Sequence, residues 1–250
     1  MVDGGVRLLP WDSEHFGIAV ARLDPADPAD VAAAVPWARE QRVHLLVARC
    51  DADAVDTIHA LERAGFLLMA SSTHYRFPLG KKPLPADPGG AAVRPFEFGD
   101  LPAIREVAAS AFHGFLGHFH NDPLLHRGKC DDLYLRWATN SCSDPNLADA
   151  VLVAEVDGRV RGFITVKRHG EDRAEAVLVA VEASAQRRGL SRSMLLASLR
   201  WCEVQGLRRH EIASQLGNFA AQRAWERMGF EIDAAWHTFH LWLDVEARPS

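Results

Sequence analysis

Three short apolar runs in the middle of the chain have the length and alternation of β-strands. They span Val151–Val156, Val160–Lys167 and Ala174–Val181. Asp157-Gly158, between the first two runs, is a residue pair that favours a tight hairpin turn. The pattern therefore predicts an antiparallel meander of three strands.

Strands and helices alternate after this meander. Apolar residues recur at helical spacing in the stretch that ends at Gln205, Arg209–Ser214 has the pattern of a short strand, and Asn218–Met228 is a second helical stretch. Gly229 stands where a helix commonly ends. The apolar positions of the second helix are Phe219, Ala221, Trp225 and Met228.

The region before the meander predicts one strand and two helices. Val93–Phe96 has strand character, Asp100–Phe112 is a helix with a capping aspartate, and Asp131–Ser141 is a second helix. Residues 91–250 then have the order β-α-α-β-β-β-α-β-α-β. This order predicts an α/β (α+β) domain, in which helices flank a mixed, mostly antiparallel sheet.

A stretch rich in proline and glycine, PLGKKPLPADPGG, separates Phe77 from Ala91. Such a composition interrupts any helix or central strand and is typical of a linker. We therefore expect a smaller domain over residues 1–80, a linker over 81–90 and a larger domain over 91–250.

The smaller domain shares a local pattern with the end of the larger one. Leu61-Glu62-Arg63-Ala64-Gly65-Phe66 matches Trp225-Glu226-Arg227-Met228-Gly229-Phe230, and an apolar strand precedes each, at Val43–Arg49 and Arg209–Ser214. We interpret residues 1–77 as a degraded half-copy of the larger domain. The alternative is that helix-glycine-strand junctions look alike because glycine often ends helices.

Composition and charge restrict the classes of function. A chain of 250 residues with 48% hydrophobic residues can bury a substantial core, and its net charge of −5 argues against general nucleic-acid binding. The N-terminus lacks a cationic and apolar leader, and no apolar run approaches the about 20 residues that span a bilayer. We expect a soluble, cytoplasmic protein with reduced cysteines, since no C-x-x-C pair occurs among Cys50, Cys130, Cys142 and Cys202.

The turn between Val181 and the following helix has the features of an anion site. Gly189 lacks the Cβ that would block a phosphate, and Arg187 and Arg188 add positive charge where free backbone N–H groups meet the helix dipole. Neither the triphosphate-binding loop nor the dinucleotide fingerprint is present, because their lysine and further glycines are missing.

Gln186-Arg187-Arg188-Gly189-Leu190-Ser191 resembles the acyl-CoA pyrophosphate loop of the GNAT (GCN5-related N-acetyltransferase) superfamily, with serine as a mild departure at the last position. Asn218, Ala221, Gly229 and Phe230 match a second signature of that superfamily. The resemblance implies acetyl-CoA as co-substrate, held by this loop and by Asn218, although Asn218 can also be no more than a helix N-cap. Val179 and Val181 would offer backbone groups to the pantetheine arm and one N–H to the oxyanion.

Two further stretches are similar to the TDP-fucosamine N-acetyltransferase group. They are Pro10–Gly17, and Phe119–Pro123 followed by Leu133–Ser141. The resemblance implies a nucleotide-linked amino sugar as acceptor, bound between a partial N-terminal domain and the catalytic domain. Trp11 and Phe16 can equally be core aromatic residues.

Candidates for proton transfer are His120, Asp122, Glu182 and His240. A histidine titrates where an amine must lose its proton, and a strand-end carboxylate beside a cleft can have a raised pKa. Each can also be structural. The histidines around His120 fit no common zinc spacing, so we expect no metal.

Trp225 stands where the superfamily pattern has a tyrosine that protonates the departing thiolate. An indole N–H can donate a hydrogen bond but cannot deliver a proton. Trp225 is therefore either a catalytic hydrogen-bond donor or a core residue.

We expect direct acetyl transfer to a small amine in a ternary complex, because no cysteine with a paired histidine points to an acyl-enzyme. Acetylation of a protein N-terminus or an antibiotic amine, and a non-catalytic acyl-CoA-binding module, are the alternatives. A homodimer is compatible with this expectation.

Overall fold

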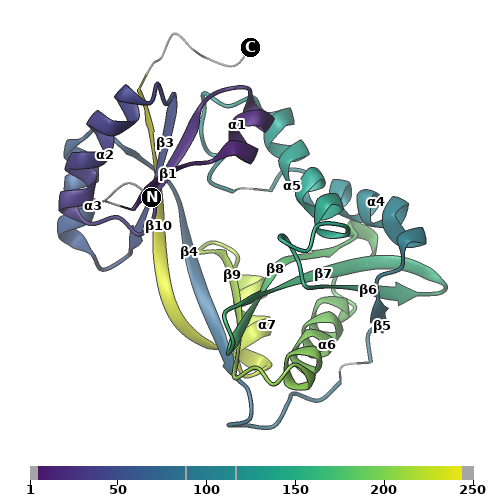
Figure 1. The fold of residues 1–250 in the computed structure, drawn as a ribbon. Coiled ribbons are helices and arrows are strands. Elements are labelled where there is room, and N and C mark those ends of the chain that lie inside the picture. Colours follow the sequence, from purple (N-terminus) through teal and green to yellow (C-terminus); the bar gives the residue numbers. More distant parts are fainter. Residues whose placement is uncertain (1–4, 88, 116, 244–250) are drawn as a thin grey trace. The chain divides into compact units, whose positions relative to one another are not determined.

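The computed structural model describes residues 5–87, 89–115 and 117–243, and the chain divides into two compact units (Figure 1). Unit 1 comprises residues 1–73, 116–130 and 234–250, and unit 2 comprises residues 74–115 and 131–233. Two of the divisions fall inside the long strands β4 (Leu67–Pro78) and β10 (Glu231–Trp242). A third division, between residues 130 and 131, falls inside the helix Arg127–Ser141, so the chain passes between the units along both strands and a helix.

The sheet of unit 2 contains the predicted meander. Its strands lie in the order β4-β9-β8-β7-β6-β5, and all neighbours from β5 to β8 are antiparallel, whereas β8 and β9 are parallel. Asp157 and Gly158 both have positive φ, 52° and 70°, as the predicted hairpin turn requires. The strands are β5 (Ala92–Pro95), β6 (Ala150–Val156), β7 (Arg159–His169), β8 (Arg173–Val181) and β9 (Arg209–Gln215).

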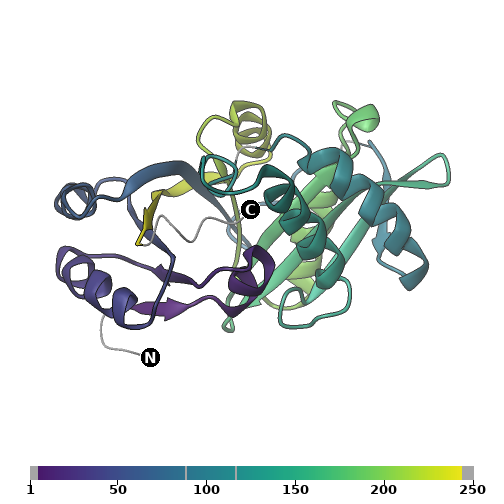
Figure 2. The same ribbon diagram turned by 90° about the horizontal axis from the view of Figure 1, so that it is seen from above.

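Helices cover both faces of β6, β7 and β8. Val153 and Phe163 face α4 and α5, which lie beside each other over the strands (Figure 2), whereas Leu152 and Ile164 face α6. Alternate residues of each strand therefore fill two separate cores. The helices are α4 (Leu101–Phe112), α5 (Arg127–Ser141), α6 (Leu190–Val204) and α7 (Phe219–Arg227), with the short 3-10 turns η1 (Phe98–Asp100) and η2 (Ala183–Ala185).

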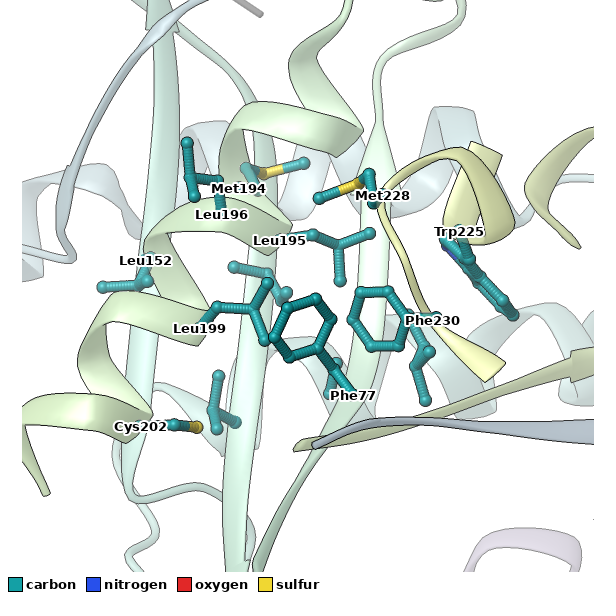
Figure 3. Close-up of a cluster of buried hydrophobic side chains, with 14 of the residues drawn as sticks. Phe77, Leu152, Met194, Leu195, Leu196, Leu199, Cys202, Trp225, Met228 and Phe230 are labelled. Atoms are coloured by element: carbon teal, nitrogen blue, oxygen red, sulfur yellow. The ribbon is translucent and has the colours of Figure 1, made fainter. Parts of the chain in front are cut away.

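The core beneath α6 combines helix, sheet and the end of β4. Phe77 of β4 packs edge-on against Phe230, with 5.4 Å between ring centroids, and both lie among the side chains of α6 (Figure 3). Buried aromatic pairs of this kind contribute roughly 0.5–1.5 kcal/mol beyond their buried area. β4 is therefore an integral part of unit 2.

Unit 1 has a smaller sheet in the order β1-β2-β3-β10-β4, with β2 and β3 parallel and β10 antiparallel to β3. Apolar side chains of two helices, α2 and α3, pack in one cluster with those of the strands. The further elements are β1 (Val6–Leu8), α1 (Pro10–Phe16), β2 (Val20–Leu23), α2 (Pro28–Glu40), β3 (Leu45–Asp51) and α3 (Val55–Arg63).

The two parts with matching sequence have the same element order. The order β2-α2-β3-α3-β4 repeats as β8-α6-β9-α7-β10, and the first two strands are parallel in each. Gly65 and Gly229 follow the two equivalent helices with φ of 88° and 91°. The last strands, however, are exchanged, because β10 pairs with β3 while β4 lies beside β9.

Because of this exchange, the two compact units do not divide at the stretch rich in proline and glycine. The stretch 81–90 belongs to unit 2, where Leu79 N–H donates to Arg208 O (2.9 Å) and Lys82 Nζ to Glu231 Oε1 (2.8 Å). Prolines end β4 as expected, but the chain after them still packs on unit 2. Residues 91–250 are accordingly not complete as a unit: unit 2 includes the end of β4 and lacks residues 116–130 and 234–250.

Candidate functional site

β8 and β9 separate about halfway along their length. Their parallel pairing runs only from Arg173↔Arg209 to Ala176↔Ile212, although β8 continues to Val181 and β9 to Gln215. The register between β8 and β7 shifts at the same point, so that Val177 has no partner in β7. A bulge bends its strand and increases the local twist, which accounts for the split.

Backbone groups of β8 face this split. Leu178 N–H donates to Thr165 Oγ1 (3.0 Å) and Glu182 N–H to Arg161 O (2.9 Å), so the even-numbered residues point toward β7. Because successive residues of a strand point their N–H and C=O groups to opposite sides, those of Val179 and Val181 point toward the split. Within the described residues, the one side-chain hydrogen bond to these groups is the long contact from Gln186 Nε2 to Val181 O, 3.4 Å.

The loop after β8 brings together the residues predicted to bind an anion. Arg187 and Gly189 both have positive φ, 63° and 86°, and α6 begins directly after Gly189 without a side-chain cap. The first bond within the helix runs from Ser193 N–H to Gly189 O (3.0 Å). Throughout the described residues no acceptor is found for the N–H groups of Gly189, Leu190, Ser191 and Arg192, as expected for an uncapped helix start.

The positively charged side chains of this loop are exposed. Arg187, Arg188 and Arg192 are exposed, and none of them has an ion-pair partner within the described parts of the chain. The side chain of Leu190, in contrast, is 1% exposed and packs in the core, so only its amide can meet a ligand. Free amides, a helix N-terminus and exposed arginines are the features with which proteins commonly bind anions.

Asn218 is the N-cap of α7. Its Oδ1 accepts from Ala221 N–H (3.3 Å), and its Nδ2 donates to Ser214 Oγ (2.9 Å). The alternative of a helix cap is therefore realised, and the side chain remains exposed at the mouth of β9 and α7.

Trp225 is a core residue at the margin of the α6 cluster (Figure 3). It is 5% exposed and packs edge-on against Tyr75, with 5.4 Å between ring centroids. No acceptor is found for its indole N–H among the described residues. Tyr75, which the sequence did not single out, places a phenol beside it and donates to Glu226 Oε1 (3.1 Å).

Glu182 does not have the environment expected of a base. Its carboxylate is paired with Arg161 and accepts from Ser184 Oγ (2.8 Å), and both contacts lower its pKa. The expected raised pKa is therefore wrong for this residue. Glu182 instead borders a cavity of about 510 Å³ beside α4, in which Arg94 pairs with Asp100 (2.7 Å) and Glu155 (3.2 Å).

Unit 1 contains a chain of hydrogen bonds between Asp122, His240 and His118. His240 Nδ1 lies 2.7 Å from Asp122 Oδ2, and His240 Nε2 lies 2.9 Å from His118 Nδ1. Trp242 Nε1–H and Leu124 N–H, each at 2.9 Å, complete the shell of the carboxylate. Asp122 and His240 are 2% and 1% exposed, whereas His118 is only half-buried.

The proton positions along these hydrogen bonds follow from the charge of Asp122, at one end of the series. Burial raises the pKa of Asp122, but the donors around it outweigh burial and the net shift is downward, so the group is a carboxylate. His240 then donates through Nδ1 and accepts at Nε2 from His118, which leaves His118 Nε2 with a lone pair. Burial, followed by the adjacent His240, lowers the pKa of His118 well below its usual value, so this ring is neutral at pH 7.

The structure thus unites two of the predicted residues, Asp122 and His240, and adds His118. His120 is buried in the same turn segment, and its charge would disfavour protonation of His118. Among the described residues no group of three or more His, Cys, Asp or Glu side chains is placed to hold a metal ion. No helix of the described chain has the length and apolar character needed to cross a membrane.

Of the stretches that resemble the TDP-fucosamine group, Pro10–Gly17 and Phe119–Pro123 meet inside unit 1, whereas Leu133–Ser141 belongs to unit 2. Phe16 is completely buried and packs against Phe119, with ring centroids 4.9 Å apart, and Lys129 Nζ donates to Phe16 O (3.1 Å). Phe16 is therefore a core residue, as the alternative held. Trp11 is only half-buried and stacks on His15 at 5.9 Å.

Comparison with known proteins finds one matching family model and several similar acetyltransferases. The model of the Acetyltransferase (GNAT) family matches residues 112–230. A curated dTDP-fucosamine acetyltransferase of Escherichia coli O6:H1 is 22% identical over 236 residues, which cover 93% of this chain and 96% of that protein. A mycothiol acetyltransferase of Actinosynnema mirum is 35% identical over 154 residues, 60% of this chain and 48% of that protein. The chain thus matches about half the length of this second relative.

Solved structures agree on the fold. A GCN5-related N-acetyltransferase from Kribbella flavida superposes with a TM-score of 0.66 at 18% identity, over 96% of this chain and 88% of that one. The alignment includes both units. Residues 112–230 therefore match the Acetyltransferase (GNAT) family, and the chain shares its fold with this solved N-acetyltransferase.

Proposed function

We propose that the protein transfers the acetyl group of acetyl-CoA to the amine of a small acceptor. In this proposal the acceptor is an amino sugar carried on a nucleotide diphosphate. The observation that carries the acceptor class is the likeness to dTDP-fucosamine acetyltransferase, which extends over 93% of the chain and so includes unit 1. The likeness to mycothiol acetyltransferase is higher in identity but covers 60% of the chain.

In this proposal the donor lies along β8 and at the start of α6. The diphosphate of CoA meets the amides of Gly189 to Arg192, and Arg187 and Arg188 add charge. The pantetheine arm follows the open edge of β8 beyond the bulge, where the backbone groups of Val179 and Val181 pair with its amides as a neighbouring strand would. Asn218 contacts the donor from the start of α7.

The reaction is direct attack of a neutral amine on the thioester. The amine nitrogen forms a bond to the carbonyl carbon, the carbon–sulfur bond breaks, and the electron pair leaves with the thiolate. An N–H from β8 stabilises the oxyanion, and removal of one such donor typically lowers the rate about 10²–10³-fold. A free thiol has a pKa of about 8.5, so the thiolate can leave near neutrality with hydrogen bonding alone. Trp225 packs in the core, and its indole N–H is proposed as such a donor, not as an acid.

The amine must lose a proton, and the hydrogen-bonded group of unit 1 has the chemistry of a proton acceptor. His118 Nε2 carries a free lone pair that can take a proton, and His240 and Asp122 hold the ring in the tautomer that leaves Nε2 free. The role resembles that of the carboxylate in a catalytic triad, which fixes a histidine tautomer and stabilises its cation. Glu182 has no part in this proposal, because its pKa is lowered.

The experiment is to incubate the protein with acetyl-CoA and a panel of amines, and to follow release of free CoA thiol. The panel contains nucleotide-linked amino sugars, the same amino sugars without nucleotide, peptide N-termini and aminoglycosides. Turnover restricted to nucleotide-linked sugars supports the proposal. Turnover with another class of amine replaces the acceptor, and tight CoA binding without any release favours a non-catalytic acyl-CoA-binding module.

A further inference from the structure

The chain segment before β5 crosses the loop after β8 at Gly90. A Cβ placed on Gly90 would lie 2.5 Å from Arg188 O, 2.8 Å from Gly189 C and 3.0 Å from Gly189 Cα. Atoms of a rigid backbone do not accept a carbon at such distances. Gly90 is not among the residues of positive φ. Glycine is therefore required here because there is no space for a side chain, and not because the backbone conformation is unusual.

The contact fixes one particular peptide group. In a trans peptide the C=O and the following N–H point in opposite directions, and Gly90 lies against the Arg188 carbonyl. The N–H of Gly189 therefore points away from Gly90. This amide is one of the four without an acceptor at the start of α6.

Gly90 is itself held from both sides. Ala92, two residues later, begins β5 and pairs with Glu155, and Ala91 packs against the core beneath α6. Leu84, on the other side, packs against the same core. The crossing segment is thus anchored on unit 2 and can act as a support for the loop.

We propose that Gly90 is a positioning residue for the CoA-binding loop. By occupying the carbonyl side of the Arg188–Gly189 peptide, it keeps the Gly189 N–H turned toward the donor diphosphate. This inference rests on the proposed role of the loop and names a residue outside the loop on which that role depends. A side chain at position 90 would push the peptide and rotate the amide.

The test compares Gly90→Ala with Gly99→Ala. Gly99 lies in the same unit, has nothing within 4 Å of its added Cβ and lacks a positive φ, so its replacement controls for loss of a glycine. Two donors are used, acetyl-CoA and S-acetylpantetheine, which lacks the diphosphate. We expect Gly90→Ala to raise the Kd of CoA at least about tenfold, the size of one hydrogen bond to a charged group, with kcat/KM for S-acetylpantetheine unchanged.

Equal CoA affinities of the two variants would overturn the inference, as would equal losses with both donors. Failure of the unaltered protein to bind CoA would instead remove the proposed function of the loop. A measurement on the unaltered protein covers the case in which Gly90→Ala does not fold. In spectra of the protein labelled with ¹⁵N-glycine, CoA should shift the signals of both Gly189 and Gly90, and pantetheine neither. A shift at Gly189 alone would contradict the contact.

Discussion

Ala176 of β8 and Ile212 of β9 form the last residue pair before these two strands separate. The side chain of Ala176 faces the core beneath α6, but past Val177 the pattern shifts by one, so that Val179 and Val181 take that side. One extra residue therefore does two things. It ends the pairing with β9, and it turns two successive odd-numbered amides toward the open edge.

Replacing Val179 by proline tests which way its amide points. Proline removes the N–H, and at position 179 this costs no bond to β7, so we expect a folded protein whose kcat falls about 10²–10³-fold if this N–H serves the oxyanion. Ala180→Pro, which removes an amide facing β7 and leaves its acceptor unsatisfied, should lower stability by about 1–3 kcal/mol. Thermal unfolding and thiol release distinguish the two variants, and equal loss of stability would contradict the assignment of the open edge.

Replacing Gly189 by valine is expected to abolish CoA binding while the protein still folds. A β-branched residue at a φ of 86° is strained by roughly 1–3 kcal/mol, and its side chain occupies the approach to the amides. Gly170→Val is a matched control, because Gly170 has a φ of 70° and open space around it. Calorimetric titration with CoA should show no binding for the first variant and unchanged binding for the second. Retained binding by Gly189→Val would remove the loop from the donor site.

The sequence located the turn between β8 and α6 because its cause is local. A glycine between an apolar strand and an amphipathic helix has few structural interpretations, and Gly189 directly precedes α6, with a left-handed backbone conformation that the sequence analysis did not address. The split between β8 and β9 had no such signal. Val177 is an ordinary strand residue, and its bulge arises from how β8 pairs with β7.

The strand exchange and the histidine that faces His240 could not be predicted from the local sequence, because both depend on contacts between distant segments. The exchange of β4 and β10 depends on which partner strand each selects, and both follow nearly the same helix-glycine junction. His118 and His120 lie in a turn segment without a regular period, so no pattern shows which ring faces His240. The sequence therefore identified the segment but not the histidine.

The packing role and the hydrogen-bonding role of Trp225 can be tested separately with two substitutions. Trp225→Tyr should preserve or raise turnover, since a phenol can deliver a proton as well as donate a hydrogen bond, whereas Trp225→Phe retains an aromatic ring without a donor. Both variants leave a space in the core and should be destabilised by a similar amount, so their unfolding temperatures serve as the control. Equal and complete loss of turnover in both would show that the indole acts by packing alone.

His210 makes stability fall with acid. It is completely buried, and burial lowers its pKa from 6.5 to about 3. Ser198 Oγ donates to Leu195 O (2.8 Å), so His210 Nε2–H donates to Ser198 (2.9 Å), and the unprotonated Nδ1 is buried with no hydrogen-bond partner in the described part of the chain. Between pH 6.5 and about 3, His210 binds a proton in the unfolded chain but not in the folded protein. The free energy of unfolding should therefore drop by about 1.4 kcal/mol per pH unit between about 6 and 3 from this group.

Urea unfolding at several pH values checks this slope. His210→Gln keeps a side-chain amide donor but cannot titrate, so the slope should be smaller in the variant by about 1.4 kcal/mol per pH unit. His59→Gln serves as the control, because His59 lies on α3 outside the cores. An unchanged slope in His210→Gln would show that His210 is protonated in the folded protein.

The pH profile of turnover tests whether His118 is the base. A base must be neutral to accept a proton, and the pKa of His118 lies well below its usual value because of burial and the neighbouring His240. The acid limb of kcat/KM due to this group should therefore lie below pH 6.5, with activity retained as pH rises above it. His118→Gln should lower kcat/KM about 10²–10⁴-fold, the usual contribution of a general base, and abolish that limb.

Asp122→Asn should lower the rate but retain an acid limb, because the histidine that titrates is still present while its tautomer is no longer fixed. His113→Gln, which alters an exposed histidine six residues after Val107 in the turn that follows α4, should leave the profile unchanged. An acid limb that survives in His118→Gln would assign the proton to another group. In that case the hydrogen-bonded chain from Asp122 to His118 is a structural element of unit 1.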